Sequence, residues 1–405
     1  MTGSTPDARD PDGGGAAYLT LRTELGETPL AFVEDPTGVY LIEQGSSRWA
    51  AAVLRRGSAV VVRRAAAEVR RADLVVEPRE RAAIWAAFVE KYGPPTVARW
   101  FPSPGRYLRL RPGPTDPPDG DRYFAWLETE FDSIADDYDR HIYGNVVNRF
   151  LRARSVELLT QRFARAPRLL EIGCGSGTET LELLREGHEV VAVDISARML
   201  AVVREKARRD GVGERLETHH LAARRLSELV PTLGVGSVDG AYSTYGALNC
   251  EPDLRPVASA LSELLPAGAP LVAGVYNRWC LFEMVSYAAV GRVDRAFERL
   301  GSPVPVGRSR FCVDTFAYSA GEFARAFTPW FSRGSVEGVV VVLPPSNLAA
   351  YLAPFRERLD RWERWDTWIG RRWPFTHLGD HFLMTMYRHP ADGEPTRPRP
   401  EGPPA

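Results

Sequence analysis

Apolar and polar positions follow two different patterns along the chain. From residue 18 to about residue 111, short runs of Val, Leu and aromatic residues are separated by turn signals such as Asp35–Gly38, which predicts β-strands joined by tight turns. Within this part, residues 79–92 have apolar residues along one face and predict a helix. Beyond residue 122, apolar runs of strand length alternate with helical patterns, and this alternation predicts a parallel α/β sheet.

The stretch Leu169–Ser196, LLEIGCGSGTETLELLREGHEVVAVDIS, predicts a strand, a glycine turn, a helix and a second strand. Glycines at every second position (Gly173, Gly175 and Gly177) let the backbone turn sharply and approach a ligand. The helix that follows begins at Thr178, and its positive N-terminal end suits a carboxylate or a phosphate. Asp194 ends the second strand, where a carboxylate can accept both hydroxyls of a ribose. The stretch therefore predicts the nucleoside-binding half of a doubly wound sheet.

The whole string from Glu171 to the VDIS sequence resembles motif I and its acidic partner in class I S-adenosylmethionine (SAM) methyltransferases. A dinucleotide site would favour G-x-G-x-x-G, and residue 178 is Thr instead. The resemblance implies a seven-stranded Rossmann-like fold with SAM as the cofactor, its methionine end at residues 173–177 and its ribose at Asp194. A ligand-free turn and a NAD or FAD site are the alternatives. The expected cofactor-binding residues are Tyr138, Glu171, Gly173, Cys174, Gly175, Gly177, Asp194, Ile195, Met199, Ala222, Ala223 and Ser243.

Two of these expectations have a structural alternative. The pattern Phe131-Asp132-x-x-Ala135-x-x-Tyr138-Asp139 resembles the opening helix of many SAM methyltransferases, which lies over the cofactor; the alternative is an amphipathic helix facing a core. Met199 either contacts the adenine or fills the core. The family commonly has Asp at the position of Ala222, so adenine recognition here would come from backbone groups near Ala223.

The segment from residue 17 to residue 111 resembles the split-barrel flavin-binding fold of the pyridoxamine-phosphate-oxidase and deazaflavin-dependent nitroreductase group. The resemblance rests on GVYLIEQGSSRWAAAVLRRGSAVVV followed by VEPRERAAIWAAFVEKY. Residues 22–29, where the family holds a cofactor phosphate, contain one Arg and two acids, and the carboxylates would repel a phosphate. We expect a small split-barrel-like β domain that has lost the cofactor, with a working flavin site as the alternative.

The predicted domain organisation follows from these patterns and from the proline-rich stretches between them. A linker is expected where four prolines interrupt the chain, and insertions after the fifth strand of the class I fold commonly form a substrate lid. The expected segments are a disordered tail at 1–16, the β domain at 17–111, a linker at 112–121, the methyltransferase domain at 122–390 with lid insertions at about 278–330 and 345–378, and a disordered tail at 391–405.

The acceptor is expected at the carboxyl ends of the strands, close to the switch point of the sheet. We expect substrate contacts from Tyr242, Asn249, Tyr276 and Trp279, and the candidate catalytic bases are Tyr245, His377 and His381. The string His377-x-x-Asp380-His381 turns from Pro374 into a strand, which disfavours a metal site. Trp362, Trp365 and Trp368 share one helical face, and this pattern favours burial against the sheet over a hydrophobic substrate wall.

Composition argues against several classes of protein: those that bind nucleic acid, those that span a membrane and those held by zinc or disulfides. Lys and Arg number 51 against 52 Asp and Glu, so neither nucleic acid nor a membrane is an expected partner. The four cysteines form no C-x-x-C pair, and no apolar run is long enough for a membrane span. We expect a cytoplasmic enzyme that methylates a small molecule; the alternatives are a non-catalytic SAM-binding scaffold and a flavin or deazaflavin oxidoreductase using the N-terminal domain. The acceptor, its methylated atom, the use of a base and the oligomeric state are not encoded in a readable pattern.

Overall fold

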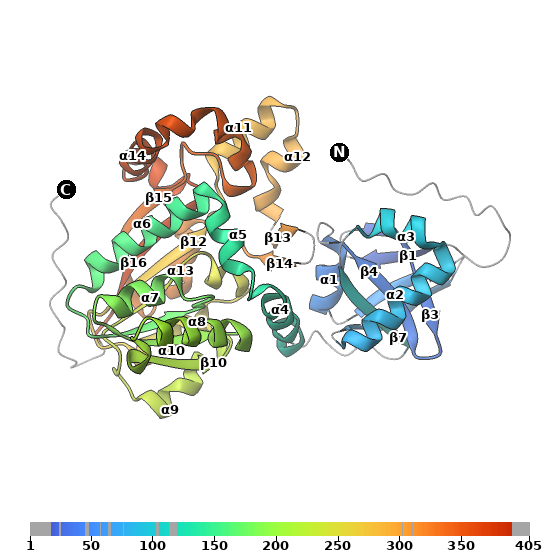
Figure 1. Cartoon of the computed structure of the whole chain (residues 1–405), viewed down its shortest axis with the longest axis horizontal. Coiled ribbons are helices and arrows are strands. Elements are labelled where there is room, and N and C mark those ends of the chain that lie inside the picture. The colour runs from blue at the N-terminus through green and yellow to red at the C-terminus, as the bar shows by residue number, and fades with distance from the viewer. Residues whose placement is uncertain are drawn as a thin grey trace. The chain divides into compact units, whose positions relative to one another are not determined.

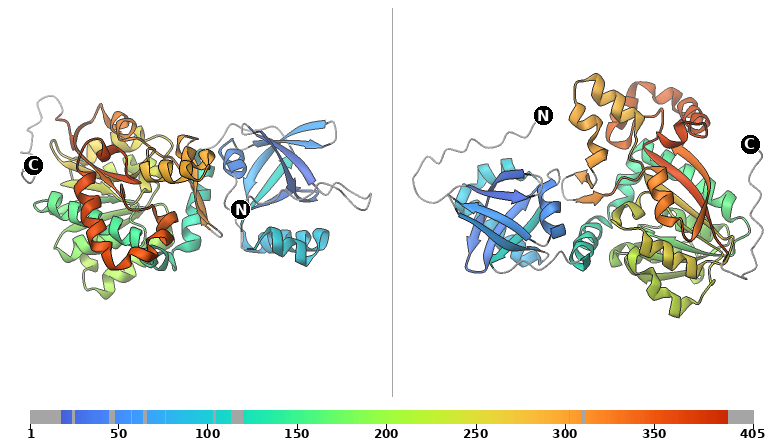
Figure 2. Two further views of the ribbon diagram at one scale, coloured as in Figure 1. Left: turned by 90° about the horizontal axis from the view of Figure 1, so that it is seen from above. Right: turned by 180° about the vertical axis from the view of Figure 1, so that it is seen from behind.

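The computed structural model describes residues 18–23, 26–44, 48–56, 58–63, 66–75, 77–102, 105–112, 120–301, 303–308 and 311–390. The chain divides into two compact units: Met1–Ser133 with Pro305–Asp314, and Ile134–Val304 with Thr315–Ala405. Figure 1 traces the chain, and Figure 2 gives two further views. The expected tails at 1–16 and 391–405, and most of the expected linker at 112–121, lie outside the described residues.

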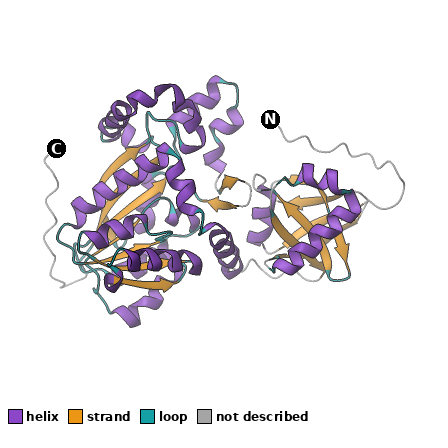
Figure 3. Cartoon of the chain, viewed as in Figure 1, coloured by secondary structure: helices purple, strands orange, loops and turns teal. Residues whose placement is uncertain are grey.

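The first unit contains a seven-stranded antiparallel sheet (Figure 3). Its strands are β1 (Tyr18–Thr23), β2 (Gly26–Ala31), β3 (Val33–Asp35), β4 (Gly38–Glu43), β5 (Ser58–Arg63), β6 (Ala66–Leu74) and β7 (Arg106–Pro112). The hydrogen-bonded order is β2-β1-β5-β6-β7-β4-β3. Because β2 and β3 are edges of this order, the split barrel expected from the sequence stays a prediction.

Helices complete the first unit: α1 (Arg48–Arg56), α2 (Pro78–Tyr92), α3 (Pro94–Trp100) and α4 (Gly120–Ile134). The apolar face predicted at 79–92 is real, since Ile84 and Phe88 of α2 are buried with Val97 of α3 against residues of β4 and β7. A separate two-stranded sheet is formed by β13 (Val304–Arg308) and β14 (Phe311–Thr315). The segment Pro305–Asp314 groups with this unit although it follows far later in the chain.

The second unit contains the predicted seven-stranded Rossmann-like sheet, in the order β10-β9-β8-β11-β12-β16-β15. The strands are β8 (Arg168–Ile172), β9 (Glu189–Asp194), β10 (Leu216–His220), β11 (Gly240–Ser243), β12 (Pro270–Tyr276), β15 (Phe331–Val339) and β16 (His381–Arg388). β8 to β12 run parallel, and β16 lies antiparallel between β12 and β15. The carboxyl ends of β8, β9 and β11 therefore meet at one edge of the sheet.

Helices cover both faces of this sheet. One face packs against α6 (Val146–Phe163), α7 (Thr178–Arg185) and α8 (Ala197–Arg209), and the other against η2 (Ala223–Leu229), α10 (Arg255–Leu264) and α13 (Ala320–Phe327). The remaining elements are α5 (Tyr138–Gly144), η1 (Gly213–Arg215), α9 (Val230–Leu233), η3 (Ala247–Cys250), α11 (Leu281–Ala289), α12 (Val293–Ala296), η4 (Glu298–Gly301), η5 (Ser346–Arg358), α14 (Leu359–Gly370) and η6 (Phe375–His377). No helix among the described residues is long and apolar enough to span a membrane.

Part of the expected first lid insertion belongs to the sheet-covering layer. Phe323 and Phe327 of α13 are fully buried, and they pack in the same core as the apolar residues of α10 and β16. A capping box at Ser319 starts this helix, since Ser319 and Glu322 bond each other's backbone N–H groups. The segment 320–327 therefore supports the sheet, and the insertion after β12 ends before it.

The tryptophan face of α14 points outward, so the expected burial of these side chains against the sheet is wrong. Trp362, Trp365 and Trp368 are 37%, 62% and 57% exposed. A neighbouring side of the helix carries Asp366, which is fully buried and accepts hydrogen bonds from four consecutive backbone N–H groups, those of residues 340–343, at 2.8–3.0 Å. Since these bonds fix the rotation of the helix about its axis, the tryptophans face away from the sheet.

We expect Gly177→Ala to destabilise the second unit more than Gly211→Ala. Both glycines have a positive φ, +85° and +70°, so both substitutions strain the backbone. A Cβ at residue 177 would lie 2.2 Å from Cγ2 of Val203, whereas a Cβ at residue 211 meets nothing within 4 Å. The clash should lower the free energy of unfolding by about 1–3 kcal/mol beyond the control, as measured by urea denaturation. Equal losses in the two variants would contradict this account of the turn.

Candidate functional site

A left-handed glycine turn follows β8 at the carboxyl edge of the parallel strands. Gly173, Gly175 and Gly177 all have positive φ angles, of +74°, +52° and +85°. The turn is tied back to β9 by hydrogen bonds from the N–H of Gly173 to the carbonyl of Val193, at 2.7 Å, and from the N–H of Gly175 to Asp194. The predicted strand, turn and helix thus occupy the predicted residues.

Two of the three glycines, Gly173 and Gly177, allow a close approach of neighbouring elements. A Cβ on Gly173 would lie 2.2 Å from Cβ of Ala247 in η3, and one on Gly177 would lie 2.2 Å from Val203 in α8. At Gly175 the nearest atom is Cε1 of Tyr138, 3.6 Å from the Cβ position. The ring of Tyr138 therefore lies beside the glycine turn, and its expected contact with the cofactor stays a prediction.

The carboxylate of Asp194 joins the turn to the end of β9. One oxygen accepts the N–H of Gly175 at 2.7 Å, and the other accepts the N–H of Ser196 at 2.8 Å. Ser196 in turn caps α8 by accepting the N–H of Met199 at 3.0 Å. A carboxylate has about four acceptor positions and can therefore serve several donors at once. Asp194 can therefore order the turn and also accept ligand hydroxyls.

A polar clamp fixes α5 against the turn, and sequence reasoning missed it. Asp139 accepts hydrogen bonds from the hydroxyl of Ser176 and from Nζ of Lys206. Lys206 also donates to the carbonyl of Ser176 at 2.8 Å. The available signal was the Tyr138-Asp139 pair that closes the opening-helix pattern. Tyr138 covers the turn, and its neighbour Asp139 holds it there.

Buried charges lie beside the turn on α6 and α7. Arg152 donates to Glu179 through Nη1, and the two side chains are 9% and 1% exposed. Nε of Arg152 and Oε1 of Glu179 have no partner among the described residues. The guanidinium also lies over the ring of Tyr245, 4.2 Å from its centroid. Glu179 follows the turn directly in the chain, whereas Arg152 lies outside the motif and only the fold brings it to the turn.

Glu171, which precedes the turn, is almost fully buried and accepts the hydroxyl of Thr180. Burial raises the pKa of Glu171 to about 8, and the nearby Glu179 raises it further, against the effect of the Thr180 bond. Glu171, two residues before Gly173 on β8, therefore holds its proton at neutral pH.

The residues expected around the adenine lie at the ends of β9 and β10. Ile195, Met199, Ala222 and Ala223 follow these strands, with Met199 almost fully buried. An acid is present close by, although not at residue 222: Glu251 accepts the N–H of Arg224 at 3.0 Å. Burial raises the pKa of Glu251 to about 7.

Two further expected cofactor residues are buried. Cys174 is 3% exposed in the turn, and burial raises the pKa of its thiol. Ser243 is 1% exposed at the end of β11, and its hydroxyl has no partner among the described residues.

Two expected substrate residues, Tyr242 and Asn249, are fully buried in the core. Tyr242 is fully buried between the sheet and α6, against Phe163, with its hydroxyl beside Glu171. Asn249 is fully buried as well, donating to the carbonyls of Tyr276 and Phe316 and accepting the N–H of Tyr276 at 2.8 Å. The pattern of apolar and polar residues along β11 and in the loop after it did not show which side chains would be buried in the core.

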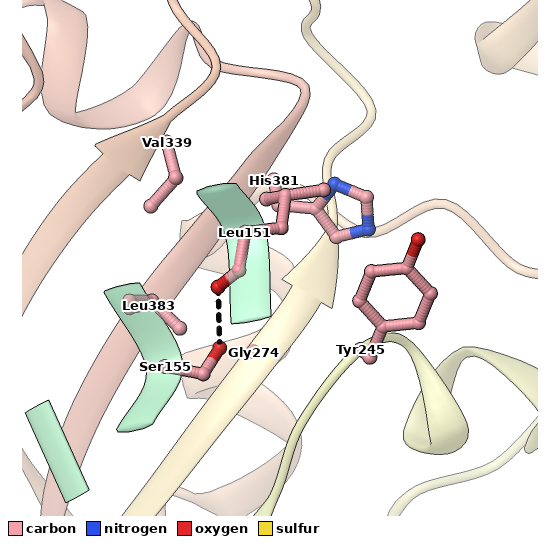
Figure 4. A pocket seen from close by; sticks show the side chains of 7 residues that line it. All are labelled: Leu151, Ser155, Tyr245, Gly274, Val339, His381 and Leu383. Atoms are coloured by element: carbon pink, nitrogen blue, oxygen red, sulfur yellow. Dashed lines mark hydrogen bonds between the residues drawn. The ribbon is translucent and has the colours of Figure 1, made fainter. Parts of the chain in front are cut away.

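The remaining candidates gather at the ends of β11, β12 and β16. The rings of Tyr245 and His381 are stacked with centroids 6.0 Å apart, and the edge of Tyr276 meets His381 at 5.5 Å. Tyr245 and His381 border a cavity of about 10 Å³, which has room for about one water molecule (Figure 4). Trp279, a little further along the chain, is 39% exposed.

The three candidate bases differ in their hydrogen bonds. Burial raises the pKa of Tyr245, so its hydroxyl keeps its proton at neutral pH. His377 has both ring nitrogens engaged, Nδ1 with Thr376 at 2.7 Å and Nε2 with Arg333 at 3.0 Å, and burial lowers its pKa. His381 bonds Asp380 through Nδ1, and its Nε2 has no hydrogen bond to a described residue. Of the three, His381 is best placed to accept a proton.

The family model of the methyltransferase domain matches residues 169–268, which contain the glycine turn and Asp194. Among curated relatives, the tRNA 5-carboxymethoxyuridine methyltransferase of Escherichia coli (strain K12) is 27% identical over 154 residues, 37% of this chain and 57% of that protein. The ubiquinone biosynthesis O-methyltransferase of Nitrosococcus oceani is 30% identical over 111 residues, 27% of this chain and 44% of that protein. The chain spans about half the length of these relatives.

Among solved structures, the 1,6-didemethyltoxoflavin-N1-methyltransferase of Burkholderia thailandensis aligns with 69% of this chain and 95% of its own, at 17% identity and a TM-score of 0.42. A SAM-dependent methyltransferase from Listeria monocytogenes aligns with 60% of this chain and 99% of its own, at 15% identity and a TM-score of 0.41. Together with the strand order, the family match identifies a class I methyltransferase domain whose cofactor is SAM.

We expect the stability of the protein to depend on pH through Glu171. The folded state, with a pKa of about 8 for Glu171, holds this proton more tightly than the unfolded chain, whose glutamates titrate near 4.5. The contribution favours folding below pH 4.5 and declines as the pH rises through 8. Replacing Glu171 by Gln should remove that decline in urea unfolding experiments from pH 5 to pH 8.

The exposed Glu182 on the neighbouring helix α7 provides a control. Glu182→Gln should follow the wild-type pH dependence throughout. If Glu171→Gln and the wild-type protein lose stability in parallel between pH 5 and 8, the carboxyl of Glu171 is ionised in the folded state and this description of the site is incorrect.

Proposed function

We propose that this chain, which carries a class I methyltransferase domain at residues 169–268, transfers a methyl group from SAM to a small-molecule acceptor. The strongest support comes from two buried polar atoms beside the glycine turn, Nε of Arg152 and Oε1 of Glu179, which have no hydrogen-bond partner in the part of the chain that the structure describes. The amino-acid end of SAM carries one carboxylate and one ammonium group. A buried cation and a buried anion with unused hydrogen-bonding capacity match that pair of charges.

The other residues that would hold SAM follow the edge of the sheet. Asp194 would accept the ribose hydroxyls while it keeps its bonds to Gly175 and Ser196. Charge-assisted bonds of this type contribute roughly 1.5–3 kcal/mol each. Ile195 and Met199, at the carboxyl end of β9, would border the adenine, with Ala222 and Ala223 opposite at the end of β10.

When bound, SAM supplies an electrophilic methyl group on a positively charged sulfur. The contribution of the chain is then mainly alignment of the two reactants, which can replace much of the entropic cost of a bimolecular step. Tyr245 is held for this purpose between Arg152 and His381, in a backbone conformation with a φ of +57°. A non-glycine residue in that region is uncommon and points to a functional position.

The charge of the chain supports a small-molecule acceptor over a nucleic acid. A protein that binds tRNA neutralises several phosphates with Lys and Arg, but the formal net charge of this chain is −1. Tyr276 offers aromatic surface beside His381, and Trp279, three residues later in the chain, is partly exposed; aromatic side chains suit an acceptor with an apolar or aromatic body. The relative from Escherichia coli makes tRNA the alternative acceptor.

Calorimetric titration of the purified chain should show that it binds SAM and S-adenosylhomocysteine. Asp194→Ala should weaken binding by about 10- to 100-fold, because it removes the acceptor of the ribose hydroxyls. Asp239→Ala is the matched control: Asp239 precedes β11 at the opposite edge of the sheet, where it accepts the N–H of Arg168 at 3.1 Å. Equal affinities for the two variants would refute the ribose site, and no binding by the wild-type chain would refute the proposed function.

The acceptor class can be tested with SAM carrying a labelled methyl group. We expect label to enter a small-molecule cell extract, with Arg152→Met preventing transfer because the cofactor carboxylate loses its partner. Total tRNA is the competing acceptor, and label found in tRNA but not in the extract would show that the acceptor is a nucleic acid. Asp239→Ala should leave transfer intact.

A further inference from the structure

His381 belongs to a buried charged cluster that extends away from the cofactor site. Asp380, which immediately precedes β16, lies with Oδ2 3.0 Å from Nδ1 of His381. Its other oxygen, Oδ1, accepts a hydrogen bond from Nη2 of Arg299. The side chains of Asp380 and Arg299 are 3% and 6% exposed. The sequence pattern singled out His381 and Asp380, as part of a disfavoured metal site, but not Arg299.

Arg299 is held so firmly that it defines the position of Asp380. Nε donates to Glu283 at 2.7 Å, and Nη1 donates to the backbone carbonyls of Asn277 at 2.9 Å and Asp380 at 3.0 Å. Glu283 lies in α11 and Arg299 in η4, so both come from the insertion after β12. Asn347, from the later insertion, donates to the second oxygen of Glu283 at 3.1 Å. Residues from two insertions therefore hold Arg299, and Arg299 in turn holds the carboxylate of Asp380.

The charge state of Asp380 decides which nitrogen of His381 carries hydrogen. Burial opposes ionisation of Asp380, but Arg299 and His381 beside it hold its pKa well below the usual range. An ionised carboxylate can only accept hydrogen bonds. Nδ1 of His381 must therefore be the donor, and in the neutral imidazole Nε2 then has the lone pair.

The cluster also compensates a proton taken up by His381. Glu283 and Asp380 carry two negative charges and Arg299 carries one positive charge, so the three groups together have a charge of −1. A proton on Nε2 brings the cluster to neutrality. An imidazolium formed at this position is therefore paired with a buried anion, as a general base requires after it has accepted a proton.

The aromatic neighbours place this base next to the cofactor site. One face of the His381 ring stacks on Tyr245, whose ring also lies under Arg152 (Figure 4 shows the first pair). Tyr276 meets the imidazole edge-on, and the guanidinium of Arg299 covers Tyr276 at 4.0 Å. His381 is thus separated by a single ring from the cation that would hold the amino-acid end of SAM.

We propose that Asp380 is a positioning residue that fixes His381 with hydrogen on Nδ1 and a basic Nε2, so that the acceptor is a molecule whose attacking O or N atom carries a proton. This inference rests on the proposed function. As the acceptor atom forms its bond to the methyl carbon, the C–S bond breaks and its electron pair passes to sulfur. The proton of the acceptor moves to Nε2, from which it later passes to water. Carboxylates, sulfides and tertiary amines need no such base.

The state of His381 can be measured without an acceptor. Full-length protein labelled with ¹⁵N-histidine contains seven histidines, and the signals of His381 are those lost in His381→Asn. Long-range ¹H–¹⁵N correlation spectra are recorded at a pH high enough for the imidazole to be neutral. They should show Nδ1 protonated and Nε2 unprotonated. Asp380→Asn should lose this preference, with signals moving toward the form protonated on Nε2, because an amide can either donate or accept.

A matched control tests whether the effect belongs to Asp380. Glu283→Gln leaves the contact between Asp380 and His381 in place, so the wild-type pattern should persist. Wild-type protein with hydrogen on Nε2, or Asp380→Asn with an unchanged pattern, would overturn the proposal. If Asp380→Asn does not fold, the wild-type spectrum alone decides.

Titration of the same samples with SAM separates the two proposals. A wild-type chain that shows the expected pattern but does not bind SAM refutes the proposed function and leaves the state of His381 established. If the wild-type chain binds SAM but His381 carries its hydrogen on Nε2, the proposed function stands and His381 is excluded as the base. Binding of SAM by Asp380→Asn within about twofold of wild type is expected, because Asp380 acts on the acceptor side.

Discussion

The close packing of the turn after β8 is the constraint on which the site depends. With no Cβ at residues 173 and 177, the backbone comes within contact distance of Ala247 and Val203, so η3 and α8 can both approach the end of β8. That approach places the N–H of Gly175 where Asp194 can accept it. A single methyl group at either position would separate the elements that carry the two ends of the cofactor site.

The local parts of this arrangement could be read from the sequence. The glycine turn and Asp194 are close together in the chain, and the alternation of strands and helices on both sides predicts the parallel sheet that the structure contains. Arg152 and Asp380 could not be assigned a role in the same way. Each depends on a partner far away in the chain, Glu179 and Arg299 respectively, and no periodicity reports such tertiary pairing.

The incorrect expectations have a common physical cause. Amphipathic spacing shows which residues share a face but does not show which face is buried. In α14 the tryptophans form the more apolar face, yet four backbone N–H groups donate to the carboxylate of Asp366 and turn the side of the helix that carries Asp366 inward, which leaves the tryptophans outside. In β11 and the loop that follows, Tyr242 and Asn249 are polar residues that the core absorbs, because their neighbours supply apolar packing or backbone hydrogen bonds.

The strands β13 and β14 have a consequence for how such a chain can be divided. The segment 305–314 groups with the first unit, although residues of the second unit precede and follow it. Tyr123 contributes to this grouping by donating to the carbonyl of Asp314 at 3.5 Å. A fragment of residues 1–133 lacks the segment 305–314. A fragment that starts at residue 134 contains this segment without the rest of the first unit. The two units therefore cannot be exchanged as cassettes by a single recombination break, and both must be inherited together.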